Sequence, residues 1–163
     1  MVFLTKKKID TRLWVGWREW VALPDLGIEA IKAKVDTGAR TSTLHAFSVE
    51  RFFEAGGQYV RFGIHPIQKR SDIVIYREAP VLDERFVSDS GGHKEKRIVI
   101  ETTLQMGLIN WPIEVTLTDR DTMQFRMLIG RTAMTGRLLV DASASYLTGK
   151  PDEEILIKHL RKT

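Results

Sequence analysis

The residues best suited to chemistry stand at the end of a short alternating segment. Val35 is followed by Asp36, Thr37 and Gly38, so a carboxylate comes directly after a predicted strand. Gly38 permits a tight turn and the close approach of another backbone or a ligand. A carboxylate presented in this way can act as a general acid or base. Because Asp-Thr-Gly is also common turn chemistry, a plain turn is the alternative interpretation.

A second segment far downstream bears on that choice. Two apolar residues, Leu128 and Ile129, precede Gly130 and Arg131, and a short helical stretch follows them. Together the two segments resemble the retropepsin-like aspartic proteases over residues 15–141. In that family Asp-Thr-Gly-Ala follows a strand, and a later apolar pair with Gly and Arg packs beneath the catalytic turn. The resemblance implies that Asp36, Thr37 and Gly38 form the catalytic turn. It also implies a structural support of the site, formed by Leu128, Ile129, Gly130 and Arg131.

One bacterial branch of this superfamily, whose members carry the name ATP-dependent zinc proteases, is similar to the chain almost throughout. The similar segments are 14–20, 23–27, 34–42, 44–46, 90–93 and 117–121. The residues themselves do not support zinc or ATP. The sequence holds no His-Glu-x-x-His, and its histidines are too far apart in sequence for typical ligand spacing. Gly149-Lys150 is followed by Pro and lacks the earlier glycine of a phosphate-binding loop. We therefore expect no metal and no cofactor.

The chemistry that the resemblance implies needs two carboxylates sharing one proton, because two like charges at close range cannot both ionise easily. This chain offers one good candidate, Asp36. Asp89-Ser90-Gly91 could be a second, but it has no following apolar segment and no apolar-apolar-Gly partner of its own. The chain is also too short for two such lobes. We expect the second acid to come from a second copy, in a homodimer.

The stretch from Phe86 to Ile100 is the candidate for a flap over the cleft. Gly91 and Gly92 would form a flexible tip, as in the Gly-rich retropepsin flap, and His93 would lie near the cleft. The alternative for His93 is an exposed turn histidine. We expect substrate binding by residues of the turn and of this tip, namely Ala39, Arg40, Gly91, Gly92 and His93.

Arg40 departs from the family pattern, because many retropepsins carry Asp there to pair with the Arg of the later motif. Arg40, Arg131 and the cations after the flap tip would make the cleft cationic and favour acidic peptides or Glu-rich protein tails. Alternatively, Arg40 and Arg131 each pair with an acid such as Asp119, Asp121 or Asp141, and the cleft is neutral. The resemblance also implies a functional link to ATP-grasp ligases that add amino acids to protein tails.

Alternation of apolar and polar residues dominates the chain and predicts strands over 27–35, 49–53, 59–64, 73–76, 97–104, 111–117 and 125–129. Two segments are predicted helices: 131–135, with Gly136 as a C-terminal cap, and 151–160, with acids first and bases last. Many short strands with turns between them indicate an all-β barrel or sandwich. With the resemblance, we expect a closed retropepsin-like β-barrel with a short helix after Leu-Ile-Gly-Arg and a C-terminal helix.

Composition is that of one globular domain: 163 residues, 43% hydrophobic and 28% charged. We divide it into a basic tail (1–10), the barrel (11–145) and a helical tail (146–163). The net charge of +4 comes from the two ends, which argues against a nucleic-acid surface on the body. No apolar run reaches membrane-helix length. The start lacks the order of a secretory signal, which predicts a cytoplasmic chain, or a periplasmic one if a leader has been removed.

Three interpretations of the whole remain open. We expect an aspartic-type peptidase that cleaves peptide or protein substrates as a homodimer. The same fold could instead serve as a non-catalytic dimerisation or peptide-binding module, although such a module has no need of Asp36. A metallopeptidase rests on the family label alone. The tryptophans at 14, 17 and 20 could form a ligand platform, but core edge or dimer contact is the more common role.

Overall fold

The computed structural model describes residues 10–89, 91–119 and 124–162. The predicted basic tail therefore lies almost entirely outside the described residues. The fold is mostly β, as the alternation predicted. Its elements are β1 (Leu13–Val15), β2 (Arg18–Leu23), β3 (Ile28–Val35), β4 (Ser42–His45), β5 (Ser48–Glu54), β6 (Gly57–Ile64), β7 (Ile75–Pro80), β8 (Asp83–Ser88), β9 (Lys94–Met106), β10 (Ile109–Thr118), β11 (Met127–Ile129), α1 (Arg131–Met134), β12 (Leu138–Val140) and α2 (Glu153–Arg161).

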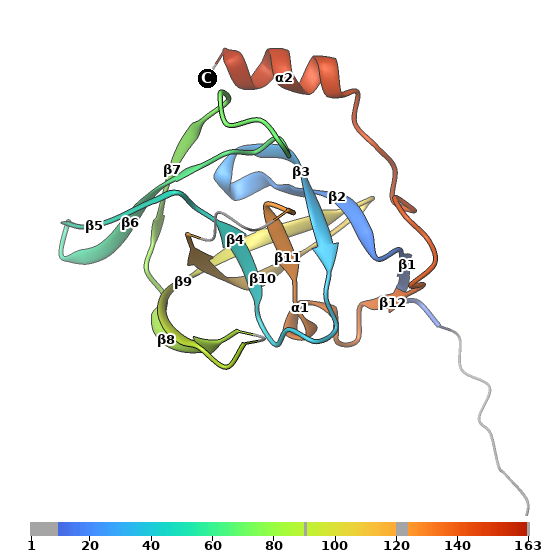
Figure 1. Cartoon of the computed structure of the whole chain (residues 1–163), viewed down its shortest axis with the longest axis horizontal. Coiled ribbons are helices and arrows are strands. Elements are labelled where there is room, and N and C mark those ends of the chain that lie inside the picture. Colours follow the sequence, from blue (N-terminus) through green and yellow to red (C-terminus); the bar gives the residue numbers. More distant parts are fainter. Residues whose placement is uncertain (1–9, 90, 120–123, 163) are drawn as a thin grey trace, which may run out of the picture.

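The central sheet of the described chain follows the order β10-β4-β11-β3-β2-β9-β8 (Figure 1). Because β9 also pairs with β10, the strand order returns on itself and the sheet is ring-like. Inside it lie fully buried apolar side chains such as Ile31, Leu44, Ile100 and Met127. The predicted alternation of β3 is confirmed, since Ile31, Ala33 and Val35 are buried whereas Lys32 and Lys34 are not.

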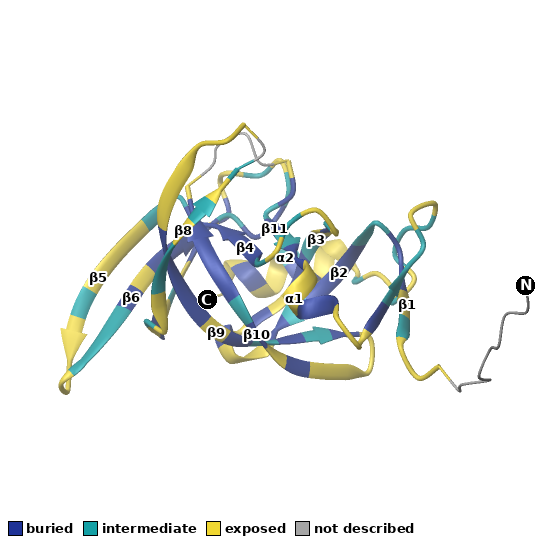
Figure 2. Ribbon diagram, turned by 90° about the horizontal axis from the view of Figure 1, so that it is seen from below, coloured by how far each residue is buried: buried dark blue, intermediate teal, exposed yellow. Residues whose placement is uncertain are grey.

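A second sheet, β5-β6-β7, stands beside the ring. Its β5–β6 hairpin projects from the body and is largely exposed (Figure 2). The base of the sheet is buried instead, with Val60, Phe62 and Ile64 all inaccessible to solvent. The strands predicted over 49–53 and 59–64 pair as this hairpin, and its turn lies at Ala55 and Gly56, whose φ values are positive at 50° and 79°.

The first strand and the last helix of the described chain both pack against the body. β1 pairs in parallel with β12, which places Leu13 against Leu138. α2 lies across one end of the molecule (Figure 1) and buries Leu156 and Leu160. It begins two residues later than the Pro151 start we predicted, because the Asp152 side chain accepts a hydrogen bond from the Ile155 backbone N–H (3.1 Å) and caps the first turn.

Candidate active site

Asp36 starts the turn that follows β3. Its Oδ1 accepts a hydrogen bond from the Gly38 backbone N–H (2.9 Å). Its own backbone N–H donates to the Ile129 carbonyl (2.9 Å), so β11 holds the turn at its first residue. The Asp36 side chain is half-buried and borders a cleft. The sequence order strand, Asp, Thr, Gly thus produces a carboxylate fixed on one oxygen by its own turn.

The segment 128–131 lies directly against that turn. β11 runs between β3 and β4, parallel to the first and antiparallel to the second. The Gly130 N–H donates to Ser42 Oγ (3.0 Å), and a Cβ at Gly130 would stand 2.6 Å from the Thr41 carbonyl carbon. No other residue type fits there without moving backbone. Arg131 donates to both sides of the turn, from its backbone N–H to the Ala39 carbonyl (2.8 Å) and from Nη1 to the Thr37 carbonyl (3.0 Å).

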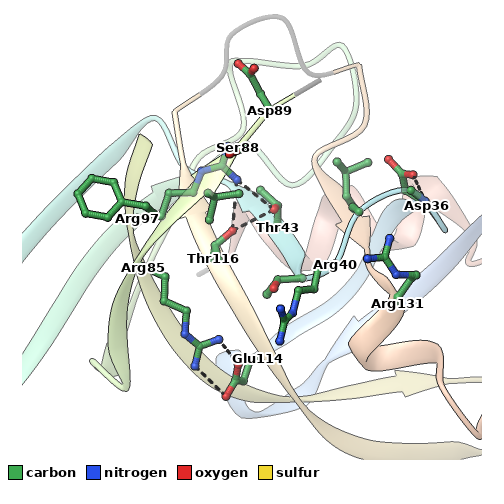
Figure 3. A pocket seen from close by; sticks show the side chains of 16 residues that line it. Asp36, Arg40, Thr43, Arg85, Ser88, Asp89, Arg97, Glu114, Thr116 and Arg131 are labelled. Atoms are coloured by element: carbon green, nitrogen blue, oxygen red, sulfur yellow. Dashed lines mark hydrogen bonds and ion pairs between the residues drawn. The ribbon is translucent and has the colours of Figure 1, made fainter. Parts of the chain in front are cut away.

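The cleft beside Asp36 has a volume of about 1040 Å³. Figure 3 shows Asp36 and Arg131 at one end, and Arg85 and Glu114 at the other. β8 contributes one wall. The residues that line the cleft are Asp36, Gly38, Ala39, Arg40, Thr41, Thr43, Arg85, Phe86, Val87, Ser88, Asp89, Arg97, Glu114, Thr116, Leu128 and Arg131.

Arg97 forms the back of the cleft although its side chain is only 4% exposed. Its Nη1 donates to the hydroxyls of Thr43 (3.3 Å) and Thr116 (3.4 Å), and its Nε donates to Glu95 Oε2 (3.0 Å). Glu95 in turn accepts from Thr118 Oγ1. A buried guanidinium needs such partners, because an unpaired charge in this position is costly.

At the far end Arg85 binds Glu114 through both terminal nitrogens and binds Asp83 through Nε (2.9 Å). The hydrogen bonds from Arg85 hold the pKa of the Glu114 carboxyl below its ordinary value, and the nearby charge of Arg40 acts in the same direction. The Arg40 guanidinium is different from the other cations of the cleft. It makes no hydrogen bond or ion pair with any residue that the structure describes. Asp119 and Asp141, both within the described chain, therefore do not neutralise it, and Asp121 lies outside the described residues.

The stretch predicted as a flap forms the hairpin of β8 and β9, with Ser88 opposite Lys94. Asp89 organises its tip, since Oδ1 accepts from the backbone N–H groups of Gly91 and His93 (2.9 Å each). Gly92 has a φ of 82°, which suits glycine. Gly91, Gly92 and His93 are exposed and lie beyond the residues that line the cleft. Ala39 and Arg40, by contrast, line it.

Arg97, one of the cations after the flap tip that the sequence placed around the cleft, lines it. The sequence alone did not single out the lining residues Thr43, Arg85, Glu114 and Thr116. Each lies on a strand, and its neighbours gave no local signal of chemistry. The histidines do not form a site either. His45 is buried, His65 stacks on Phe47, and His159 bonds Glu29. Among the described residues no group of three His, Cys, Asp or Glu side chains could hold a metal ion. Over the same residues, no helix combines the length and apolarity that crossing a membrane requires.

Comparison with known proteins adds three findings. Residues 14–151 match the RimB-like family, described as retropepsin-like aspartic endopeptidase RimB. A probable alpha-L-glutamate ligase of Parasynechococcus marenigrum is 49% identical over 85% of this chain and 30% of its own length. One of Shewanella pealeana is 46% identical over 90% of this chain and 32% of its own. The chain thus spans about a third of the length of these curated relatives.

The fold also has a solved counterpart. The crystal structure of a Legionella pneumophila protein of unknown function superposes with a TM-score of 0.69 and 25% sequence identity. The match covers 83% of this chain and 97% of the other. The fold of most of this chain therefore occurs in an experimental structure.

Proposed function

Because this chain belongs to the RimB-like family of retropepsin-like aspartic endopeptidases, we propose that it is an aspartic-type endopeptidase with Asp36 as its catalytic carboxylate. The observation that carries the proposal is the fixed orientation of this side chain. The Gly38 N–H holds one oxygen, and the segment 128–131 supports the turn from behind. A turn without chemistry needs neither the cleft nor this support.

The proposed reaction requires a second carboxylate, and we assign it to Asp36 of a second copy. Two other acids line the cleft of this chain, and both have structural partners. Glu114 is bound by Arg85, and Asp89 caps the flap tip. In the dimer one Asp36 is ionised and the other neutral. The ionised one takes a proton from a water molecule, whose oxygen attacks the substrate carbonyl carbon, while the neutral one donates its proton to the carbonyl oxygen. Collapse of this intermediate breaks the C–N bond and returns a proton to the leaving amine.

We further propose a preference for acidic peptides or for protein tails rich in Glu. Three of the four arginines lining the cleft have partners: Arg85 with Glu114, Arg97 with Glu95, and Arg131 with the Thr37 carbonyl. The Arg40 guanidinium alone has neither a hydrogen bond nor an ion pair with a described residue, so it is available to a substrate carboxylate. The names of the relatives agree with this chemistry, since an alpha-L-glutamate ligase joins glutamate to its acceptor. We propose that the chain acts beside such a ligase.

The experiment for catalysis compares the parent protein with Asp36→Asn on acidic and basic peptides. Asn keeps the shape of Asp but cannot share the proton, so turnover should vanish while the circular dichroism spectrum is unchanged. Asp119→Asn, an exposed substitution of the same kind, is the matched control and should cleave normally. If Asp36→Asn cleaves as fast as the parent, the aspartic mechanism is wrong.

Mixing the two proteins tests the dimer. If both Asp36 side chains are needed, activity should fall with the square of the parent fraction as Asp36→Asn protein is added and subunits exchange. A linear fall, with a monomer in sedimentation, would contradict the shared site. Arg40→Gln should raise KM for acidic peptides and leave basic ones unaffected, and added salt should do the same. If the parent protein binds peptides but cleaves none, the non-catalytic peptide-binding module is the better account.

A further inference from the structure

A group of cations outside the cleft forms no ion pair with any residue that the structure describes. In the register of β2 and β3, Arg18 stands opposite Lys34, and Trp20 stands opposite Lys32. All four side chains therefore lie on the same face of this hairpin, where Lys34 is exposed, Arg18 and Lys32 are partly buried and Trp20 is buried. Like charges directly opposite each other destabilise a pair of strands. The sequence alone does not show this arrangement, because the cations belong to two separate strands. They become neighbours only through the pairing register of β2 and β3.

A fourth cation, Lys150, lies beside the same group of residues because it contacts the Tyr146 ring. The segment that follows β12 runs beside β2 on its way to α2 (Figure 1). Three charged groups surround the ring of Tyr146: the Arg18 guanidinium carbon at 4.9 Å from the ring centroid, Lys32 Nζ at 5.8 Å and Lys150 Nζ at 4.8 Å. Arg18 also lies 4.6 Å from the Trp17 ring centroid. We call Arg18, Lys32, Lys34, Lys150 and Tyr146 the cationic patch. None of its four cations forms an ion pair with a described residue.

The backbone at Tyr146 is strained. Its φ is 57°, a left-handed conformation that residues other than glycine rarely adopt. The segment is fixed by Glu19, whose buried carboxylate accepts four hydrogen bonds. They come from the backbone N–H groups of Gly16 (2.7 Å), Leu147 (2.9 Å) and Thr148 (3.0 Å), and from Thr148 Oγ1 (2.8 Å). Strain that is compensated by specific contacts is often found where a protein binds a ligand.

The patch is continuous with the cleft. Pairing across five strands aligns Thr116 with Thr43, Thr43 with Leu128, Leu128 with Lys34, and Lys34 with Arg18. The first three members of this row line the cleft. Lys34 and Lys32 also precede Asp36 by two and four residues on β3, so they stand roughly 7 and 13 Å from it along the strand. A polypeptide in the cleft reaches the patch with a few extended residues.

We propose that the cationic patch is an exosite that binds an acidic segment of the polypeptide substrate outside the cleft. Rows of carboxylates match four cations that form no ion pair with a described residue, although Arg18 donates a hydrogen bond to Ser145 Oγ (3.1 Å). The row of paired residues leads from the cleft to the patch. The aromatic rings argue against a nucleic acid as the occupant, because Arg18, Lys32 and Lys150 already cover the rings on which bases would stack. The link to catalysis rests on the proposed function, whereas the binding itself does not.

Binding is measured with Asp36→Asn protein and fluorescent oligo-L-glutamate, by anisotropy at two salt concentrations. Lys32→Gln/Lys34→Gln, with Arg18→Gln added in a second variant, should weaken binding about tenfold and flatten its salt dependence. The double variant leaves Arg18 between its two rings, which guards against a folding defect. Lys158→Gln/Lys162→Gln, which removes the same charge from α2 and the residue after it, is the matched control and should bind as the parent does. Equal binding by parent and patch variants, or an equal loss in the control, overturns the proposal.

Two further arms separate the alternatives. A single-stranded RNA of matched charge that binds more tightly than oligo-glutamate, through the same residues, would reassign the patch to nucleic acid. In active protein the double variant should raise KM about tenfold for a long acidic peptide, with little change in kcat, and leave a peptide confined to the cleft unaffected. If the parent protein cleaves nothing, the anisotropy result still decides whether the patch binds acidic chains, so the two proposals fail separately.

Discussion

Removing the Glu19 carboxylate should destabilise the protein far more than its place on a short strand suggests. Glu19→Ala leaves four donors without their acceptor, three of them backbone N–H groups. A buried donor without a partner costs about 1–3 kcal/mol. Gly16 is buried, whereas water can reach the segment around the exposed Leu147. We therefore take a value near the lower limit for each donor and expect a loss of about 4 kcal/mol. That is a large part of the ~5–15 kcal/mol that holds a domain folded.

The assay is urea unfolding followed by circular dichroism, in which a lower midpoint at constant slope reports lost stability. Glu19→Gln keeps one oxygen acceptor in the same shape, so it should lose about half as much. Glu101→Ala, which removes an exposed carboxylate with no such partners, should stay within about 0.5 kcal/mol of the parent. A loss below about 1 kcal/mol for Glu19→Ala would refute the reasoning, because the segment around Tyr146 would then be held by something else. The same variant should also weaken oligo-glutamate binding, since Tyr146 and Lys150 would no longer be held on the patch.

Three further predictions concern the cleft. Gly130→Ala should cost about 2 kcal/mol or more and abolish turnover, because the new Cβ would stand 2.6 Å from Thr41 backbone. Gly38→Ala meets only Asp36 Oδ1, at 3.2 Å, so it should impair turnover more than urea stability; the reverse order would contradict the proposed role of the turn. Because Arg85 lowers the pKa of Glu114, the stability from this pair is present above the unfolded pKa and is lost as the pH falls through the folded one. In a carboxyl NMR titration, Arg85→Gln should raise the Glu114 pKa; no change would mean that the ion pair is not formed in solution.

The turn at Asp36 could be located from sequence because its signal is local. A clean alternating strand and a glycine two residues after the acid are enough to place a carboxylate at a strand end. The contact of this turn with residues 128–131 is long-range, and composition or periodicity cannot show it. That part came from the family resemblance, and the structure places Gly130 and Arg131 in hydrogen-bonding contact with Ser42, Thr37 and Ala39.

Several strands gave no usable pattern, for reasons that the structure explains. All four residues of β4 are buried, so their polarity cannot alternate with exposure. β1 and β12 have three residues each and exist through their parallel pairing with each other. β8 pairs with β9 but is exposed over much of its length. Its charged residues therefore show no alternation that would predict a strand. Arg97 was predicted on the polar face of its strand, yet it is buried because Thr43, Thr116 and Glu95 supply its hydrogen bonds.

The composition of the chain does not show where its charges lie on the folded protein. Counted along the sequence, the cations outside the two ends are balanced by acids, and this balance argued against a nucleic-acid surface. Folding separates the two signs. Glu19 turns inward to bind backbone N–H groups, while Arg18 beside it turns outward toward Tyr146. Neighbouring residues of a strand face opposite sides of the sheet, so an acid and a cation next to each other in sequence are placed on opposite faces. A body with almost no net charge can therefore present a cationic surface, and the register between β2 and β3 decides where it lies.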